Sequence, residues 1–278
     1  MPEQLIRTSA PRPHAVVVLV IALVALLSGS APQADARVVP PMFRMMYLPD
    51  DQDRSIAEAR DSLIAACMAA HGHSYSVQVD DITEAEALAA LRPFGLESLE
   101  NLMPEPQPAE AVQGEDYARA LFGDPGQRVK ANGERLGMTL PATGCQADAE
   151  RRLLGDQRLR ALELRLRLYD GERDAREQLD RDPAFVAATE RWRRCVSGFG
   201  VDARTPDELL SALSGDADLA AEPAVRADVR CKHVTGYLGT AYARLAACQQ
   251  NWLDEHADLV AEWRALRQRQ HAVAQRVL

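Results

Sequence analysis

The C-terminal part of the chain carries a regular apolar repeat, and this repeat predicts a long helix. Steps of seven residues from position 231, and a second row three residues further on, meet only apolar side chains: Cys231, Leu238, Leu245, Trp252, Leu259, Leu266 and Val273, then Val234, Ala241 and Cys248. Such spacing is typical of the seam of a coiled coil. We expect one continuous helix over residues 224–278, about 80 Å long at about 1.5 Å per residue. Its polar positions, Gln249 among them, should be exposed.

A second apolar seam predicts a partner for this helix. Leu159, Leu162, Leu166 and Tyr169 fall on one side of a helix that begins at Cys145 and runs to about Asp180, before a proline. We expect this seam to pack along the C-terminal stripe, and we favour a parallel direction. Leu and Arg alternate from Arg158 to Leu168, which predicts a solvated, salt-bridged surface; binding to a membrane surface is the alternative.

Shorter helices are predicted by their capping signals. Ser55 with Glu58 forms a capping box that opens a helix ending near Gly72. Further helices are expected over residues 83–91, 183–198 or 183–200, and 205–213. Residues 74–79 alternate like a short strand or an extended arm. Several prolines and glycines predict irregular structure over residues 92–143, with a short helix at 115–122.

The N-terminus has the features of an export signal. An apolar run from Ala15 to Leu27 follows two arginines and precedes the small-residue site Ala34-Asp35-Ala36. The run is shorter than the roughly 20 residues of a membrane span. We predict a cleaved signal peptide over residues 1–36, with an uncleaved membrane anchor as the alternative. The protein is then secreted or extracytoplasmic, and it is tethered to the membrane only if the leader is retained.

The mature chain is expected to form a flexible tether followed by an all-α domain. Residues 37–53 contain three prolines and no helical period, which indicates the tether. Residues 54–278 are expected to form a disulfide-linked helical bundle. The net charge of −9 over 278 residues argues against nucleic acid as a partner, because neutralising phosphates requires a basic face.

The order of features in the domain indicates an internal duplication with halves 54–180 and 183–278. In each half a cysteine precedes a glycine by five residues, a capped short helix follows, and another cysteine opens a long helix. The matching residues are Cys67, Gly72 and Cys145 in the first half and Cys195, Gly200 and Cys231 in the second. Chance similarity between alanine-rich helices is the alternative, and the shared order of features favours duplication.

This order proposes the disulfides Cys67–Cys145 and Cys195–Cys231. Five cysteines allow about fifteen ways to form two bonds, so the sequence alone does not decide among them. A bond between Cys231 and Cys248 is excluded, because one helix would hold them about 25 Å apart. Cys248 is left without a partner in this scheme, and its place in the apolar seam predicts a buried free thiol, with an intermolecular bond or a reactive thiol as the alternatives.

Several of these residues also form short motifs. They are Cys67-Met68 with Gly72, Gly144-Cys145, Trp192-x-x-Cys195 with Phe199-Gly200, and the cysteine that opens the C-terminal helix. In this the chain resembles a group of uncharacterised exported actinobacterial proteins with Cys-Met-x-x-x-Gly and Trp-x-x-Cys-Met motifs. Val196 departs from the usual Met, and His73 and Val201 replace an aromatic residue that commonly follows the glycine. The resemblance implies a helical, disulfide-linked envelope protein and brings no catalytic residues.

Few residues are candidates for a metal-binding, catalytic or ligand-binding site. His71 and His73, near Asp80-Asp81 and Cys67, are the best metal candidates, but Cys67 is better used in a disulfide, and we expect neither metal nor cofactor. His256 lacks the second histidine of a zincin motif, so a solvated position is favoured. Trp252 and Trp263 could stack on a ligand, although packing in the helix seam is favoured. The sequence contains no Gly-x-Ser-x-Gly motif, phosphate loop or dinucleotide fingerprint.

The sequence therefore favours a secreted structural or interaction protein of the cell envelope, without catalytic activity. Its partner would be another envelope protein or a second copy, bound through the free faces of the long helices. The alternative is an extracytoplasmic small-ligand binder or enzyme with its site within residues 92–143. A concave pocket with convergent polar groups would favour this alternative.

Overall fold

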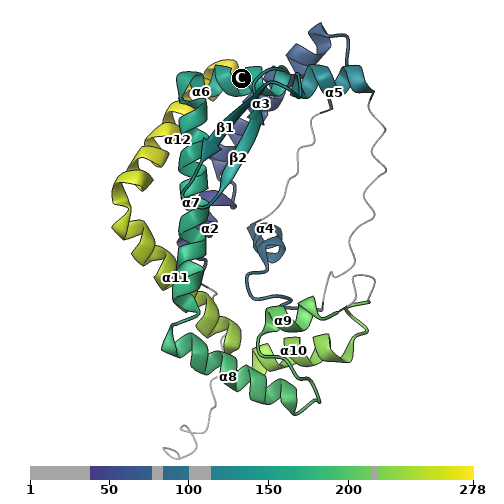
Figure 1. The fold of residues 1–278 in the computed structure, drawn as a ribbon, viewed down its shortest axis with the longest axis vertical. Coiled ribbons are helices and arrows are strands. Elements are labelled where there is room, and N and C mark those ends of the chain that lie inside the picture. The colour runs from purple at the N-terminus through teal and green to yellow at the C-terminus, as the bar shows by residue number, and fades with distance from the viewer. Residues whose placement is uncertain (1–37, 77–83, 100–113, 214–217) are drawn as a thin grey trace, which may run out of the picture. The chain divides into compact units, whose positions relative to one another are not determined.

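The computed structural model describes residues 38–76, 84–99, 114–213 and 218–278, which are mostly helical (Figure 1). They belong to a compact unit, Arg37–Leu278, that is separate from Met1–Ala36. The helices are α2 (Pro41–Met46), α3 (Asp51–Ala70), α4 (Glu84–Leu91), α5 (Glu115–Phe122), α6 (Cys145–Leu154), α7 (Arg158–Leu179), α8 (Pro183–Ser197), α9 (Pro206–Ser211), α10 (Pro223–Val234), α11 (Tyr237–Glu255) and α12 (Ala257–Val277). Among the helices described, none is long and apolar enough to cross a membrane.

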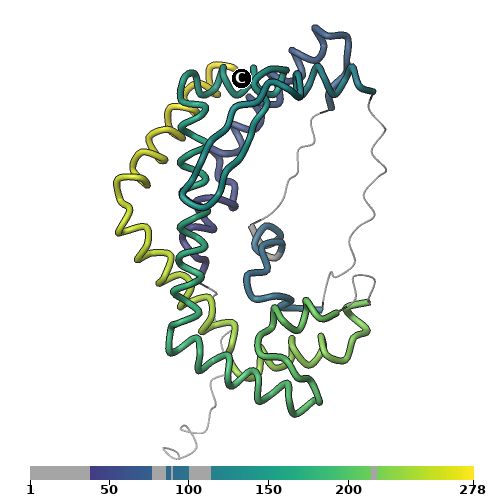
Figure 2. The backbone as a smooth tube through the Cα atoms, in the orientation of Figure 1, coloured from purple at the N-terminus to yellow at the C-terminus, as the bar shows by residue number. Residues whose placement is uncertain are grey.

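The C-terminal stretch is three helices, so the prediction of one continuous helix over residues 224–278 is wrong (Figure 2). Gly236 has a left-handed backbone with a φ of 64° and separates α10 from α11. Glycine adopts this conformation at no steric cost and is a poor helix former. His256 separates α11 from α12, and its Nδ1 donates a hydrogen bond of 2.8 Å to the carbonyl of Trp252. Val234, placed in the seam by the repeat, is 67% exposed at the end of α10.

The other long helix is interrupted in the same way. Gly155 has a φ of 55° and begins a short 3₁₀ turn, Gly155–Gln157, between α6 and α7. The beginning at Cys145 and the end at Leu179 agree with the prediction, but the continuity between them does not. In both stretches the apolar repeat predicted the helices but not their breaks, which lie at Gly155, Gly236 and His256.

Helices α7 and α11–α12 run antiparallel, so the favoured parallel direction is wrong. Arg160 near the start of α7 pairs with Glu262 on α12 at 2.7 Å, whereas Asp182, just beyond α7, pairs with Arg244 on α11 at 2.6 Å. The Cys195–Cys231 bond explains this direction. It holds α10 beside α8, which follows the C-terminal end of α7, and α11 therefore starts there and runs back along α7.

The face of α7 that meets the C-terminal helices is not the predicted one. Leu168 packs with Trp252, while Ala175 and Leu179 pack in the largest core cluster together with Leu245. At Gly171 an added Cβ would lie 2.5 Å from the ring of Trp252, so this close approach requires glycine. Of the predicted seam, Leu159 is 41% exposed, and Leu162, Leu166 and Tyr169 pack instead with Ala131 and Leu140 of a β-hairpin.

This hairpin lies in the region predicted to be irregular. Strands β1 (Arg128–Asn132) and β2 (Gly137–Pro141) pair antiparallel, with Ala131 opposite Met138. The turn is fixed on α7, where Asp170 Oδ2 accepts a 2.7 Å hydrogen bond from the backbone N–H of Glu134. Ala131 is the one fully buried residue of β1. The strands therefore lack the apolar alternation that makes a strand visible in a sequence.

The predicted tether over residues 37–53 is also wrong. Met42 and Phe43 of α2 are buried in the core, and the hydroxyl of Tyr47 donates to Glu172 on α7 at 2.5 Å. Helix α3 begins earlier than predicted, because Asp50 and Asp53 form its capping box. The predicted box residue Ser55 lies inside the helix and donates to the carbonyl of Asp51.

The remaining short helices agree with the sequence. Helix α5 has the predicted bounds, α4 ends at Leu91, α8 begins at Pro183 and ends at a glycine, and α9 is capped by Thr205 and ends at Ser211. The cap at Thr83 and residues 77–79 of the predicted strand lie outside the described residues, and residues 74–76 form no strand.

Candidate functional site

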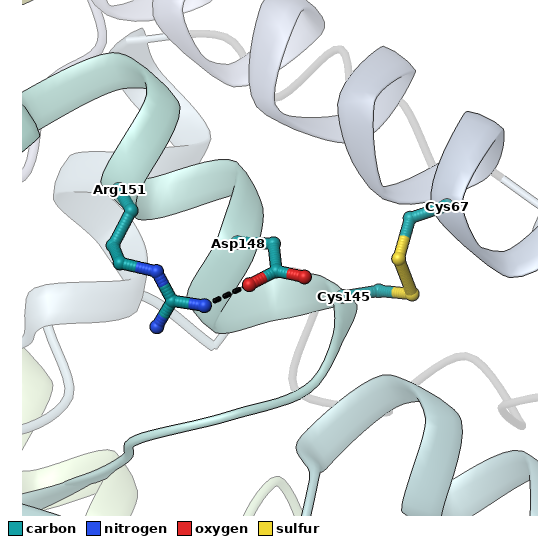
Figure 3. Close-up of a disulfide and its surroundings, with 4 residues drawn as sticks. All are labelled: Cys67, Cys145, Asp148 and Arg151. Atoms are coloured by element: carbon teal, nitrogen blue, oxygen red, sulfur yellow. Dashed lines mark hydrogen bonds and ion pairs between the residues drawn. A yellow bond between two sulfur atoms is a disulfide. The ribbon is translucent and has the colours of Figure 1, made fainter.

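The first disulfide joins α3 to α6. Cys67 in the last turn of α3 is bonded to Cys145, the first residue of α6, with their Cα atoms 5.5 Å apart (Figure 3). Cys145 is fully buried among Ile64, Met68 and Ala149, and Tyr75 and Tyr117 pack at the edge of this cluster. One turn further along α6, Asp148 pairs with Arg151 at the surface. The bond and its neighbours hold helices together and present no reactive group.

The second disulfide, Cys195–Cys231, joins α8 to α10, with a Cα separation of 5.7 Å. Both bonds are the pairs that the duplicated order proposed, and Cys248 is the buried free thiol. Burial raises the pKa of Cys248, which disfavours the reactive thiolate.

The duplicated order is also visible in the ends of the cysteine helices. Gly72 and Gly200 both have a left-handed backbone, with φ of 81° and 77°. The residue after each glycine donates its N–H to the carbonyl of the residue after each cysteine: His73 to Met68 at 2.9 Å, and Val201 to Val196 at 3.2 Å. One difference remains. Cys145 opens α6, whereas Cys231 lies well inside α10.

A buried ion pair lies beside the second disulfide and was not predicted from the sequence. Lys232 Nζ donates to Asp228 Oδ2 at 2.7 Å and to the carbonyl of Leu96 at 2.8 Å, and both charged side chains are 0% exposed. Trp192 Nε1 donates to the other carboxylate oxygen at 2.9 Å. Burial raises the pKa of Asp228 and lowers that of Lys232, and their mutual attraction opposes both shifts. The chain has only two lysines, and one of them, Lys232, lies four residues after Asp228. This spacing on one helix was the sequence feature that could have predicted the ion pair.

The metal candidates are only partly brought together. Ligand atoms of Cys67, His71 and Cys145 lie within 4.8 Å of one another, the one such grouping of three within the described residues. The two sulfur atoms are bonded to each other and therefore offer no thiolate. The ring of His73 packs against Tyr117 at 5.5 Å, while Asp80-Asp81 lies outside the described residues.

The two tryptophans and His256 take packing positions. Trp252 is buried, and the ring of His256 stacks on it with centroids 3.9 Å apart. Trp263 is partly buried, and the guanidinium of Arg267 lies 5.9 Å from its ring centroid.

The best candidate site is a cavity of about 700 Å³ between the hairpin, α7, α11 and the segment after α4, which we call the hairpin cavity. It is lined by Phe43, Leu91, Pro93, Leu136, Gly137, Met138, Leu166, Tyr169, Glu172, Arg173, Arg176, Leu245 and Gln249. Leu136 and Met138 of the hairpin are large apolar side chains that are 40% and 42% exposed. The volume of the hairpin cavity lies in the usual range for small-molecule sites.

Gln249 is the most informative residue of the hairpin cavity. It was expected to be exposed, and this is wrong: the side chain is 0% exposed. Its Oε1 accepts a 2.9 Å hydrogen bond from the backbone N–H of Met42, which fixes the orientation of the amide. Its Nε2 is buried and makes no hydrogen bond within the described structure. Buried amide donors are nearly always paired, so this group calls for an acceptor.

The charged residues of the cavity are mostly engaged. Glu172 accepts the hydrogen bond from Tyr47, and burial raises its pKa. Arg176 donates to the carbonyl of Pro93 at 2.6 Å and to Asp207 at 3.2 Å. Arg173 is exposed and lies 3.8 Å from the carboxylate of Glu177. The lining thus contains two cations and one acid, and the carboxylates of Asp207 and Glu177 beside the arginines offset part of their positive charge.

The lining of the hairpin cavity contains few of the side chains that common hydrolytic sites use. None of the described residues that line the cavity is a serine, threonine, cysteine or histidine, and only one carries a carboxylate. Nucleophilic catalysis needs a nucleophile next to a base, and acid–base hydrolysis commonly needs two carboxylates. The described lining supplies neither arrangement.

Comparison with protein families, with characterised proteins and with solved structures finds no match to this chain. The resemblance to exported actinobacterial proteins therefore stays a prediction from the short motifs.

Proposed function

We propose that the protein is a non-catalytic, extracytoplasmic binding protein of the cell envelope that takes a small ligand into the hairpin cavity. The observation that carries the proposal is the unpaired, buried amide donor of Gln249 on the wall of a cavity of about 700 Å³. A concave site with convergent polar groups is what distinguishes a ligand binder from a purely structural bundle. Part of the wall, Pro93 and Leu136 to Met138, comes from the region 92–143, where the alternative site was expected.

The faces of the long helices give less support to a protein partner. Arginines of α7 are engaged in ion pairs, Arg158 with Glu150, Arg160 with Glu262 and Arg167 with Glu134. This is the salt-bridged surface that the Leu-Arg alternation predicted. Helix-in-groove recognition uses an apolar row, and the apolar rows of α7 already pack against α11 and the hairpin.

One observation supports an extracytoplasmic location: the two disulfides indicate an oxidising environment. Mass spectrometry of the exported protein should find Arg37 at its N-terminus.

The binding role is tested with a neutral apolar probe. Titration of N-phenyl-1-naphthylamine should give saturable fluorescence with the wild-type protein, and Met138→Asp should weaken binding about tenfold by placing a charge at the mouth of the cavity. Leu159→Asp is the matched control, because Leu159 is exposed to the same extent but does not line the cavity. Equal binding by both variants, or no binding by the wild type, would overturn the proposal.

A further inference from the structure

The unpaired donor of Gln249 determines what the ligand must offer. Because the N–H of Met42 occupies Oε1, the amide presents only N–H bonds to its remaining surroundings. A ligand that satisfies Nε2 must therefore bring a hydrogen-bond acceptor. An ammonium group has no acceptor to offer and would leave the donor unpaired.

The charges of the wall point in the same direction. Arg176 and Arg173 lie on the same helix as Glu172, the one acidic residue among the described lining residues. Arg176 is bonded to the carbonyl of Pro93 and to Asp207, and Arg173 lies 3.8 Å from Glu177, so part of their positive charge is offset. The one acid of the lining already accepts a hydrogen bond from Tyr47 and lies beside two arginines, which disfavours a cationic head group and favours a neutral or negative one.

The rest of the wall requires an apolar body. Phe43, Leu91, Leu166 and Leu245 lie around the cavity, and Leu136 and Met138 stand partly exposed on the hairpin. A ligand that covered these two side chains would remove apolar surface from water, which favours association. A small polar metabolite would leave the apolar wall unused.

On these grounds we infer that the hairpin cavity binds a single-chain amphiphile whose head group is a carboxylate or an ester carbonyl, with this oxygen accepting a hydrogen bond from Gln249 Nε2. The inference rests on the proposed binding function and names its ligand class. A free alkyl carboxylate and the acyl ester of a larger lipid share this chemistry, and the test below separates them.

The experiment is displacement of N-phenyl-1-naphthylamine by decanoate, methyl decanoate and decyltrimethylammonium, each kept below its micelle-forming concentration. We expect at least one of the two oxygen-bearing ligands to displace the probe at a concentration about tenfold lower than the ammonium compound does. Stronger displacement by decanoate identifies the charged carboxylate as the head group, and equal displacement identifies the carbonyl oxygen shared with esters.

A pair of neighbouring variants tests the role of the amide. Gln249→Leu keeps the size of the side chain and removes the donor, so the preference for the oxygen-bearing ligands should disappear. Gln250→Leu is the matched control, because Gln250 is exposed on the same helix and donates to Asp254 instead. If Gln249→Leu fails to fold, which circular dichroism will show, the ligand series on the wild-type protein decides alone.

The outcomes separate this inference from the proposed function. Failure of the probe to bind would overturn both. Probe binding with equal displacement by all three amphiphiles would overturn the inference about the head group, while the cavity would stand as a binding site. Unchanged preference in a folded Gln249→Leu variant would overturn the role given to the amide.

Discussion

The two disulfide-linked halves share the same helix ends and bonding pattern, but the side chains buried around the two disulfides differ. A left-handed glycine follows both α3 and α8 within three residues of the helix end, and each of these helices is bonded to a helix of its own half. Around Cys67–Cys145 the buried neighbours are small or aliphatic, such as Ile64 and Ala149. Around Cys195–Cys231 lie Trp192, Tyr237 and the ion pair of Asp228 with Lys232. The repeated motif thus fixes how a helix ends and where it is bonded, while the surrounding side chains set local stability.

Loss of both disulfides should have the largest effect. The bonds span 78 and 36 residues, and loop closure predicts that each stabilises the fold by about 4 kcal/mol, with a difference of under about 1 kcal/mol between them. Chemical denaturation of Cys67→Ala/Cys145→Ala and of Cys195→Ala/Cys231→Ala checks this. The variant lacking all four cysteines should be unfolded or nearly so, since net stabilities are typically about 5–15 kcal/mol.

Hydrogen exchange on the two double variants sharpens the comparison. We expect α3 and α6 to lose protection when Cys67–Cys145 is removed, because their shared core is small. Helices α8 and α10 should retain more protection without Cys195–Cys231, because the largest cluster holds them. Equal loss of protection in both halves would mean that the different surroundings do not matter.

Breaking the buried ion pair should cause the next largest loss of stability. Lys232→Met leaves the carboxylate of Asp228 buried with Trp192 as its remaining hydrogen-bond donor, and such a change typically costs about 3–5 kcal/mol. The double variant Asp228→Leu/Lys232→Met should recover part of this loss, because no buried charge is left. Denaturation midpoints measure both effects. A double variant as unstable as Lys232→Met would show that the other hydrogen bonds of the pair, rather than its charges, carry the stability.

How far the sequence predicted this molecule depends on the range of each signal. The helix ends near Gly72 and Gly198 and the helix start at Pro183 are set by neighbouring residues, so they were predictable. The disulfides followed from the repeated order. The hairpin and α2 were missed because five-residue strands and a six-residue helix are too short for a periodic pattern.

The hairpin cavity was beyond the reach of the sequence for a different reason. Its wall combines residues from α2, the segment after α4, the hairpin, α7 and α11. Gln249 looked like an exposed residue because the helix period describes one helix at a time. Its burial depends on α2, whose packing no periodic pattern indicated. Only tertiary contacts between distant segments reveal such a site.

Replacing Glu172 should have the smallest effect on stability, and it allows a comparison with Asp228, the other buried acid. Unlike Asp228, it is bonded to a tyrosine, and burial raises its pKa above the ordinary value. Because the folded-state pKa is the higher one, Glu172 contributes stability below about pH 4, and this contribution is lost as the pH rises through the folded-state pKa. Glu172→Gln keeps an acceptor for Tyr47, so it should melt at a higher temperature than the wild type at neutral pH.

Thermal melts from about pH 4 to about pH 8 measure this difference, which should shrink toward the acidic end. Glu177→Gln is a suitable control, because Glu177 is a more exposed acid on the same helix and pairs with Arg135. A gain for Glu172→Gln that is the same at every pH would contradict the raised pKa.

The burial of Lys232 also has a practical consequence for labelling the protein. The chain has two lysines, and with Lys232 fully enclosed an amine-reactive dye meets only Lys130 among the lysine side chains of the native protein. Lys130 is exposed on β1, opposite Thr139 and one residue along the strand from Ala131, the partner of Met138. The chain therefore offers, without any engineered substitution, a single lysine on the hairpin that borders the cavity. A fluorophore attached there would report on its occupancy, with the amino terminus as the second amine to be separated by the pH of the coupling reaction.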